Sequence, residues 1–179
     1  MPTLYVVATP IGNLGDMSPR AIETLRAVQL IAAEDTRVTM KLLNAFDIST
    51  PLTSCHEHNE RSKAAQIAQR MLAENIDVAV TTDAGTPCIS DPGSVLVREA
   101  AERGIPVVAV SGPTAMASAL SVSGMDISEF TFYGFLPRQK NELREKLTDM
   151  ARHSKIAVVH ESPHRVIELL QQVQAVLPH

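Results

Sequence analysis

The sequence predicts an α/β fold in which an N-terminal domain with a parallel sheet is followed by a second, apparently incomplete α/β domain. Short β-rich runs alternate with helical patterns along almost the whole chain of 179 residues. Two of these runs, residues 76–80 and 105–110, are strongly apolar, as strands are when helices cover both faces of a sheet. Several strands are followed by loops rich in Asp, Ser, Thr, Gly and Pro. Such loops are typical of the ligand-binding edge of a parallel sheet.

The N-terminal domain opens with a strand and a capped helix. Residues 4–8 are apolar and β-rich, and they predict the first strand. A helix is expected over residues 19–28, because Ser18 is a favoured N-cap residue and Pro19 suits the first helical turn. Residues 30–33 predict a second, short strand.

The same alternation continues to the end of this domain. Residues 38–45 predict a helix and residues 51–55 a weaker strand. Residues 59–74 place apolar side chains along one side only, which is the pattern of a helix packed by one face on a core. The remaining predicted elements are, in order, a strand over 76–80, a helix over 94–102, a strand over 105–110 and a helix rich in Ala and Ser over 113–122.

We place the domain boundary at residue 120, with domains over residues 1–120 and 121–179. The second domain has predicted strands over 130–135 and 156–160 and predicted helices over 139–152 and 166–176. A sheet of two strands is marginal by itself. We therefore expect either that this domain is truncated or that a partner subunit completes its sheet.

Composition indicates a globular protein of ordinary type, with 45% apolar and 20% charged residues. No apolar run approaches the ~20 residues that a membrane helix needs, and no signal peptide pattern opens the chain. The two cysteines lack metal-type spacing and suggest a reducing compartment. We expect a cytoplasmic protein with no membrane association and no bound metal.

Charge and aromatic content limit the kind of partner. The net charge of −4 argues against broad, nonspecific binding of nucleic acids, although a local basic face is compatible with it. Aromatic residues make up only 3% of the chain, so platforms for base stacking are scarce.

Four loops follow strands of the N-terminal domain and are expected to form a ligand site together. They are loop one (residues 8–17), loop two (34–37), loop three (83–93) and loop four (111–115). In loop one, Gly12 and Gly15 have the spacing G-x-x-G. Neither the dinucleotide-binding pattern nor the P-loop is present, which counts against a dehydrogenase and an ATPase.

Two charged segments have alternative interpretations. In loop two, Glu34, Asp35 and Arg37 suit either a ligand site or a helix cap with a surface ion pair, which contributes only ~0–1 kcal/mol. His56 and His58 would share one face of a strand, but no third metal ligand is evident. Contact with substrate or helix capping is the favoured interpretation of the two histidines.

Taken together and in order, several segments resemble the ribosomal RNA small-subunit methyltransferase I family. This family belongs to the tetrapyrrole methylase superfamily, the class III methyltransferases that use S-adenosyl-L-methionine. The resemblance extends along essentially all of the chain. The segments that carry it are residues 4–14, 33–37, 56–60, 82–93, 111–115, 132–137 and 161–165.

The resemblance implies a tetrapyrrole methylase-like fold of two α/β domains, usually in a homodimer, with S-adenosylmethionine in the cleft between the domains. It also implies 2′-O-methylation of a cytidine ribose in 16S rRNA, within the small ribosomal subunit. By the same resemblance, His160 or Glu161 would be the contribution of the second domain. The residues implied to bind the cofactor are Pro10, Asp83, Ala84, Gly85, Cys88, Thr114, Ala115 and Glu161.

Methyl transfer requires that the acceptor oxygen, the methyl group and the sulfur lie on one line. Positioning of the reactants is therefore expected to supply most of the catalysis and can lower the barrier by ~7–11 kcal/mol. A base need only take the proton of the hydroxyl group. The candidate catalytic residues are Asp83, Glu34, Asp35 and His56, with His58 as a further candidate base. The candidate contacts to RNA substrate are Arg37, His58, Arg61 and Arg165, since a guanidinium group suits phosphate.

Two alternatives remain at this level. One is a methylase of a tetrapyrrole, a porphyrin or corrin, which would need a large apolar cavity; the polar segments 34–37 and 56–60 argue for a polar substrate instead. The other is a non-catalytic module that binds the cofactor or a nucleotide as a structural ligand.

Overall fold

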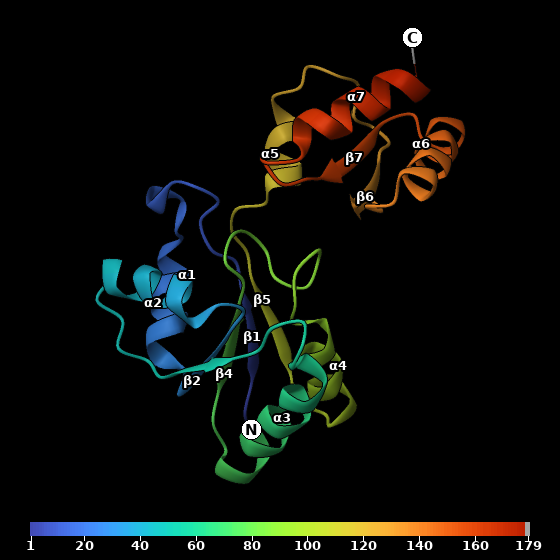
Figure 1. Ribbon diagram of the computed structural model, residues 1–179. Coiled ribbons are helices and arrows are strands. Elements are labelled where there is room, and N and C mark those ends of the chain that lie inside the picture. Colours follow the sequence, from blue (N-terminus) through green and yellow to red (C-terminus); the bar gives the residue numbers. More distant parts are fainter. Residues whose placement is uncertain (178–179) are drawn as a thin grey trace. The chain divides into compact units, whose positions relative to one another are not determined.

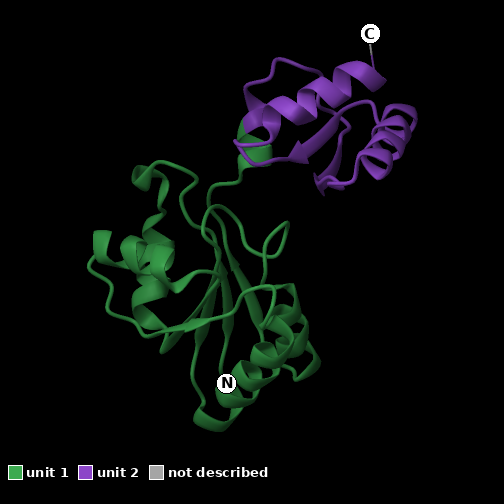
Figure 2. Cartoon of the chain, viewed as in Figure 1, with its two compact units in different colours: residues 1–118 green, residues 119–179 purple. Residues whose placement is uncertain are grey.

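The computed structural model describes residues 1–177, which form two compact units (Figures 1 and 2). Unit 1 is Met1–Ser118, and unit 2 begins at Ala119. This division falls two residues before the boundary expected from the sequence. The assignment of the two units as separate domains stays a prediction.

Unit 1 is built on a parallel sheet with the strand order β3-β2-β4-β1-β5. Its strands are β1 (Leu4–Val7), β2 (Leu30–Ala33), β3 (Leu52–Ser54), β4 (Val78–Thr81) and β5 (Val107–Val110). The predicted parallel α/β fold is therefore confirmed. In the register, Leu4 lies opposite both Val78 of β4 and Val107 of β5. Strand β1 lies between β4 and β5 and thus brings loops one, three and four to neighbouring positions on one edge of the sheet.

The helices of unit 1 are α1 (Pro19–Ala27), α2 (Thr36–Ala45), α3 (Glu60–Glu74) and α4 (Ser94–Glu102). A further helix, α5 (Ala115–Ser121), crosses the division between the units. Helix α4 has the predicted bounds, whereas α2 begins two residues earlier than predicted because Asp35 caps it. Loop one also contains a short 3₁₀ helix, η1 (Leu14–Asp16), which the sequence analysis did not predict.

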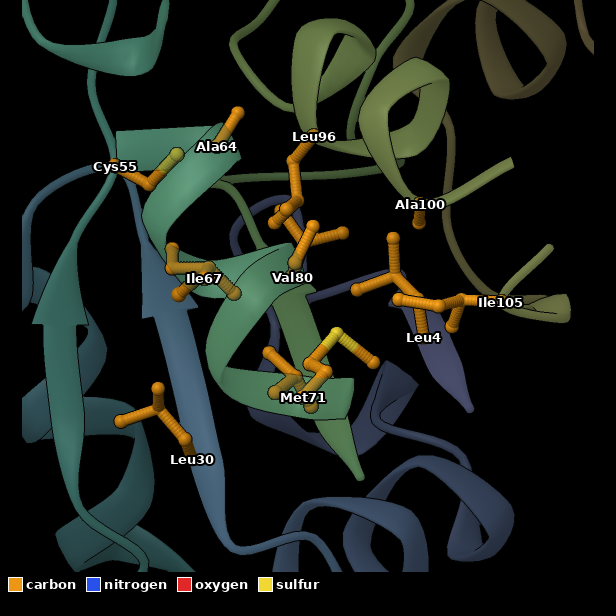
Figure 3. Packing of buried hydrophobic residues seen from close by; sticks show 13 residues of the cluster. Leu4, Leu30, Cys55, Ala64, Ile67, Met71, Val80, Leu96, Ala100 and Ile105 are labelled. Atoms are coloured by element: carbon orange, nitrogen blue, oxygen red, sulfur yellow. The ribbon is translucent and has the colours of Figure 1, made fainter. Parts of the chain in front are cut away.

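Two apolar cores lie on opposite faces of the sheet, since successive side chains of a strand point to opposite sides. Val78 and Val80 of β4 enter the core under α3 and α4, while Ala79 enters the core under α1 and α2. Figure 3 shows the first core, where Met71 of α3 and Leu96 of α4 converge on the sheet. Helices on both sides hold the strands, and hence the loops at their ends, in fixed register.

The expectation that both strongly apolar strands are covered on both faces holds for only one of them. All residues of β4 are buried, and β4 lies inside the sheet. The expectation is wrong for strand β5, which forms an edge of the sheet and leaves Val107 37% exposed. An edge strand has a neighbour on one side only, so fewer side chains pack against it.

Helix α1 depends on the cap that the sequence predicts. The Ser18 Oγ accepts the backbone N–H of Ala21 at 3.1 Å, and Pro19 occupies the first turn. We expect Ser18→Ala to lower the free energy of unfolding by about 0.5–2 kcal/mol, because this N–H loses its acceptor. Urea denaturation measures the change, with the exposed substitution Glu23→Ala as the control. An equal effect of both substitutions would contradict a specific role for the cap.

Unit 2 contains the parallel strand pair β6 (Thr131–Phe135) and β7 (Ala157–His160) with helices α6 (Lys140–His153) and α7 (Val166–Val176). Its small core includes Leu136 of the segment after β6, Leu147 of α6 and Leu169 of α7. Both predicted strands and both predicted helices are present. Across residues 1–177, no helix is long and apolar enough to cross a membrane.

Candidate functional site

Loops one, three and four are joined by hydrogen bonds at the carboxyl ends of β1, β4 and β5. The backbones of Thr9 and Gly85 exchange two hydrogen bonds, of 2.9 and 3.1 Å. The hydroxyl of Thr9 donates to the carbonyl oxygen of Thr82 at 3.1 Å, and that of Thr86 donates to the carbonyl oxygen of Pro113 at 3.1 Å. Three segments that are far apart in the sequence therefore form one continuous surface.

Two glycines permit the close approach of these loops. Gly85 has a φ of +90°, and a Cβ there would lie 3.3 Å from Cγ2 of Ile11. A Cβ added at Gly112 of loop four would lie 2.9 Å from the Cβ of Ala8, closer than real Cβ contacts come. Larger residues would force the loops apart.

A carboxylate cluster of Glu34, Asp35 and Asp83 lies beside this junction. The Glu34 Oε2 accepts the hydroxyl of Thr82 at 2.5 Å and the backbone N–H of Asp83 at 3.1 Å. The backbone N–H of Asp35 donates to Asp83 Oδ1 at 3.2 Å. Loops two and three thus hold each other in place. The fold brings together these carboxylates, which are three of the four predicted catalytic residues.

The carboxylates of this cluster differ in their electrostatics. Burial, and secondarily the nearby Glu34 carboxylate, raise the pKa of Asp83. Hydrogen bonds from Arg37 hold the pKa of Asp35 well below its usual range. Of the two carboxylates, Asp83 is therefore the stronger base.

Asp35 and Arg37 also have the structural role that the sequence left open for loop two. The Asp35 side chain accepts the backbone N–H of Arg37 at 2.8 Å and caps α2. Its ion pair with Arg37, at 2.5 Å, is exposed, with 86% of the Arg37 side chain in solvent. Such an exposed pair adds little stability.

A cavity of about 300 Å³ lies between loop one and α2. Pro10 and Asp83, both implied by the resemblance to bind the cofactor, are among its walls. Leu14 of loop one and Val38, Lys41 and Leu42 of α2 also contribute. The cavity thus opens directly beside the carboxylate cluster.

The interpretation of His56 and His58 as neighbours on one strand face is wrong. Strand β3 ends at Ser54, and both histidines lie in the turn before α3, with their rings edge to face 6.0 Å apart. The Nδ1 atom of His56 is buried and lacks a hydrogen-bond partner within residues 1–177. Within residues 1–177, neither histidine ring forms a hydrogen bond with the carboxylate cluster. Arg61 lies exposed in the first turn of α3.

The described residues include no group of three or more His, Cys, Asp or Glu side chains that would hold a metal ion. Cys88 lies in loop three, half-buried, with a φ of +69°, and Cys55 is buried in the core. Burial raises the pKa of both thiols to about 11. Both stay protonated near neutrality, so Cys88 offers a packing surface rather than a nucleophile.

Glu60 is a residue whose role the sequence analysis missed. This glutamate is only 8% exposed, and its Oε1 accepts the backbone N–H groups of Gly93 at 2.6 Å and Val95 at 3.0 Å. Gly93 is the N-cap of α4 and has no side chain with which to cap the helix. Glu60 therefore supplies the cap from the neighbouring helix α3 and fixes the end of loop three. In the sequence, the position of Glu60 at the start of the predicted helix was the only feature that could have indicated this role.

Of the remaining predicted site residues, Ala84 lies in loop three, Thr114 in loop four and Ala115 at the start of α5, all in unit 1. Glu161 and Arg165 lie in unit 2. There Arg165 Nη2 pairs with the nearly buried Glu161 carboxylate at 3.4 Å.

His160, the alternative contributor from unit 2, packs its ring edge to face on Phe132 at 4.9 Å. The contribution of His160, Glu161 and Arg165 to the site of unit 1 stays a prediction.

Comparison with known proteins finds close relatives over nearly the whole chain. The chain is 46% identical to the "Ribosomal RNA small subunit methyltransferase I" of Vibrio cholerae over 98% of its own length. It is 48% identical to the proteins of the same name from Xylella fastidiosa and Pseudomonas aeruginosa, over 97% of its length. The chain spans 61%, 63% and 61% of the length of these three relatives, respectively. These similarities confirm the resemblance seen in the sequence motifs.

A family model agrees with the fold. The model described as Tetrapyrrole (Corrin/Porphyrin) Methylases matches residues 3–178, which is almost the entire chain. The chain belongs to the family of tetrapyrrole (corrin/porphyrin) methylases.

Proposed function

We propose that the protein is a methyltransferase that uses S-adenosylmethionine to 2′-O-methylate the ribose of a cytidine in 16S rRNA. The relatives named ribosomal RNA small subunit methyltransferase I support methyl transfer and a ribosomal RNA of the small subunit as the substrate. The observation that carries the proposal is the junction of loops one, three and four beside the carboxylate cluster and an open cavity.

The residues of this junction suit a small, polar cofactor. Gly85 and Gly112 lack side chains where the loops approach most closely, so the three loops can join into one surface for a ligand. Ala84 and Gly85 of loop three and Thr114 and Ala115 after loop four would hold S-adenosylmethionine. When bound, it supplies a methyl group activated by an adjacent sulfonium.

Asp83 is the proposed general base. The acceptor hydroxyl must lose its proton as its oxygen gains the methyl group, and Asp83 lines the cavity from which the acceptor would approach. Glu34 accepts the backbone N–H of Asp83 and so orients this residue. The backbone N–H of Asp35 holds one oxygen of the Asp83 carboxylate, which leaves the other available for the proton.

Proposed partners follow from the same function. The substrate would be 16S rRNA within the small ribosomal subunit, with Arg37, His58, Arg61 and Arg165 as contacts to phosphate or nucleotide. We further propose a homodimer and a location in the cytoplasm, where ribosomal subunits are found.

The two alternatives have less support. A tetrapyrrole needs a large apolar cavity, and the cavity beside Asp83 measures about 300 Å³, the lower limit of ordinary ligand pockets. The relatives named above are ribosomal RNA methyltransferases, which favours catalysis over a purely structural ligand.

The test measures transfer of labelled methyl groups by the full-length protein to small ribosomal subunits from a strain that lacks this enzyme. We expect label on a ribose 2′-oxygen of 16S rRNA. Transfer to a tetrapyrrole instead would replace the proposed substrate, and cofactor binding without any transfer would favour a non-catalytic module.

A further inference from the structure

We propose that the cavity between loop one and α2 receives the nucleoside that accepts the methyl group, turned out of the RNA strand. This inference rests on the proposed function and assigns a surface to the acceptor. It also makes α2, which the sequence analysis linked to substrate only through Arg37, a wall of the acceptor site.

The position of Asp83 divides the acceptor side from the cofactor side. Asp83 is a wall of the cavity, whereas Ala84 and Gly85, the next residues along loop three, are not among its walls. Gly85 bonds to Thr9, and Thr86 bonds to Pro113 of loop four. Loop three therefore turns from the cavity toward loop four directly after Asp83. A base at this turn would lie next to both reactants.

The walls of the cavity suit a nucleoside. Pro10, Leu14, Val38 and Leu42 give it apolar sides, onto which an unstacked base or a ribose ring can pack. Enzymes that do chemistry on a base commonly take its nucleotide out of the stack into a fitted pocket, and our inference extends this arrangement to a ribose hydroxyl. A volume of about 300 Å³ has room for one nucleoside but not for a nucleoside together with the cofactor.

Charge at the mouth of the cavity suits the flanking phosphates. Lys41 is an exposed wall residue, and no ion pair involves it among residues 1–177. Arg37 precedes it by four residues on α2, so the two cations lie on the same side of the helix. Because Arg37 already pairs with Asp35, Lys41 is the cation at this mouth that is left to bind a flanking phosphate.

The experiment fills the cavity from α2 and compares the result with a matched surface change. Val38→Phe adds volume at a wall residue, whereas Met40→Phe adds an aromatic ring on the same helix at an exposed residue that is not a wall. The full-length variants are tested for S-adenosylmethionine affinity by calorimetry and for methyl transfer to small ribosomal subunits. We expect Val38→Phe to lower transfer about 10²-fold with unchanged cofactor affinity, and Met40→Phe to change neither.

A second variant, Lys41→Ala, is expected to raise the KM for ribosomal subunits while kcat stays unchanged. Loss of cofactor affinity in Val38→Phe would assign the cavity to the cofactor and overturn the inference. Undiminished transfer by Val38→Phe would overturn it as well. If the unsubstituted protein transfers no methyl group, the proposed function itself is refuted. The assignment of an acceptor site, which depends on that function, is then refuted as well.

Discussion

Replacing Asp83 by Asn is expected to lower kcat for methyl transfer by about 10²–10⁴-fold, the usual contribution of a general base. Asparagine keeps the size of the side chain and an oxygen that can accept the Asp35 backbone N–H, but it cannot take a proton. The measurement is single-turnover transfer of labelled methyl groups to small ribosomal subunits by the full-length protein.

The matched control is Asp35→Asn in the same carboxylate cluster. Asp35 caps α2 and pairs with Arg37, and its pKa lies well below the usual range, so it is a poor base. We expect this variant to keep most of its turnover and to lose some stability at α2. If Asp35→Asn loses as much turnover as Asp83→Asn, the assignment of the base to Asp83 is wrong.

The raised pKa of Asp83 gives the reaction a pH dependence with a definite sign. Asp83 accepts a proton only in its ionised form, so the rate is expected to rise with pH through the raised pKa. Glu34→Gln removes a neighbouring negative charge but keeps an oxygen that can accept from Thr82 and Asp83. The pKa of Asp83 should then fall, and the rising limb of the pH–rate profile should move to lower pH. If the rising limb of the pH–rate profile does not move, the ionisation of Asp83 does not control the rate.

Replacing Glu60 by Ala is expected to lower the free energy of unfolding by about 2–4 kcal/mol, because one buried and one partly buried N–H group lose their acceptor. These are the amides of Gly93 and Val95, which share the Oε1 atom of Glu60. Gly93 cannot replace this cap, so the first turn of α4 would be left open. Urea denaturation monitored by circular dichroism measures the loss.

Two further variants separate the cap from a general effect of charge. Glu60→Gln retains an amide oxygen at the same place and is expected to recover much of the stability. Glu57→Ala removes an exposed carboxylate from the same turn and is expected to have an effect within ±0.5 kcal/mol. Similar losses from Glu57→Ala and Glu60→Ala would contradict the capping role.

The cap also connects stability to the site, because Gly93 is the last residue of loop three. With the end of that loop released, Ala84 and Gly85 would no longer be held in one arrangement. We therefore expect Glu60→Ala to weaken S-adenosylmethionine binding as well, and Glu60→Gln to restore it. Unchanged cofactor affinity in Glu60→Ala would mean that loop three keeps its form without the cap.

The elements that the sequence predicted best have strong local signals. Helix α4 has its predicted bounds, and so does α7. Ser18 and Pro19 marked the start of α1 correctly. The Ser18 cap and the apolar stripes of the helices depend on residues close in the chain, whereas the cap of α4 comes from Glu60 of α3. The exposed face of β5 had no such signal, because only the strand order makes β5 an edge.

The sequence by itself determined the parallel α/β fold, the loops that gather at the strand ends and the family resemblance. These follow from periodicity, from turn residues and from the rule that parallel strands end at one edge. Only the tertiary structure decided which side chains meet there. The bonds of Glu34 to Asp83 and of Glu60 to Gly93 join residues far apart in the chain. Pairing of this kind depends on strand order and helix packing, which no local pattern of residues encodes.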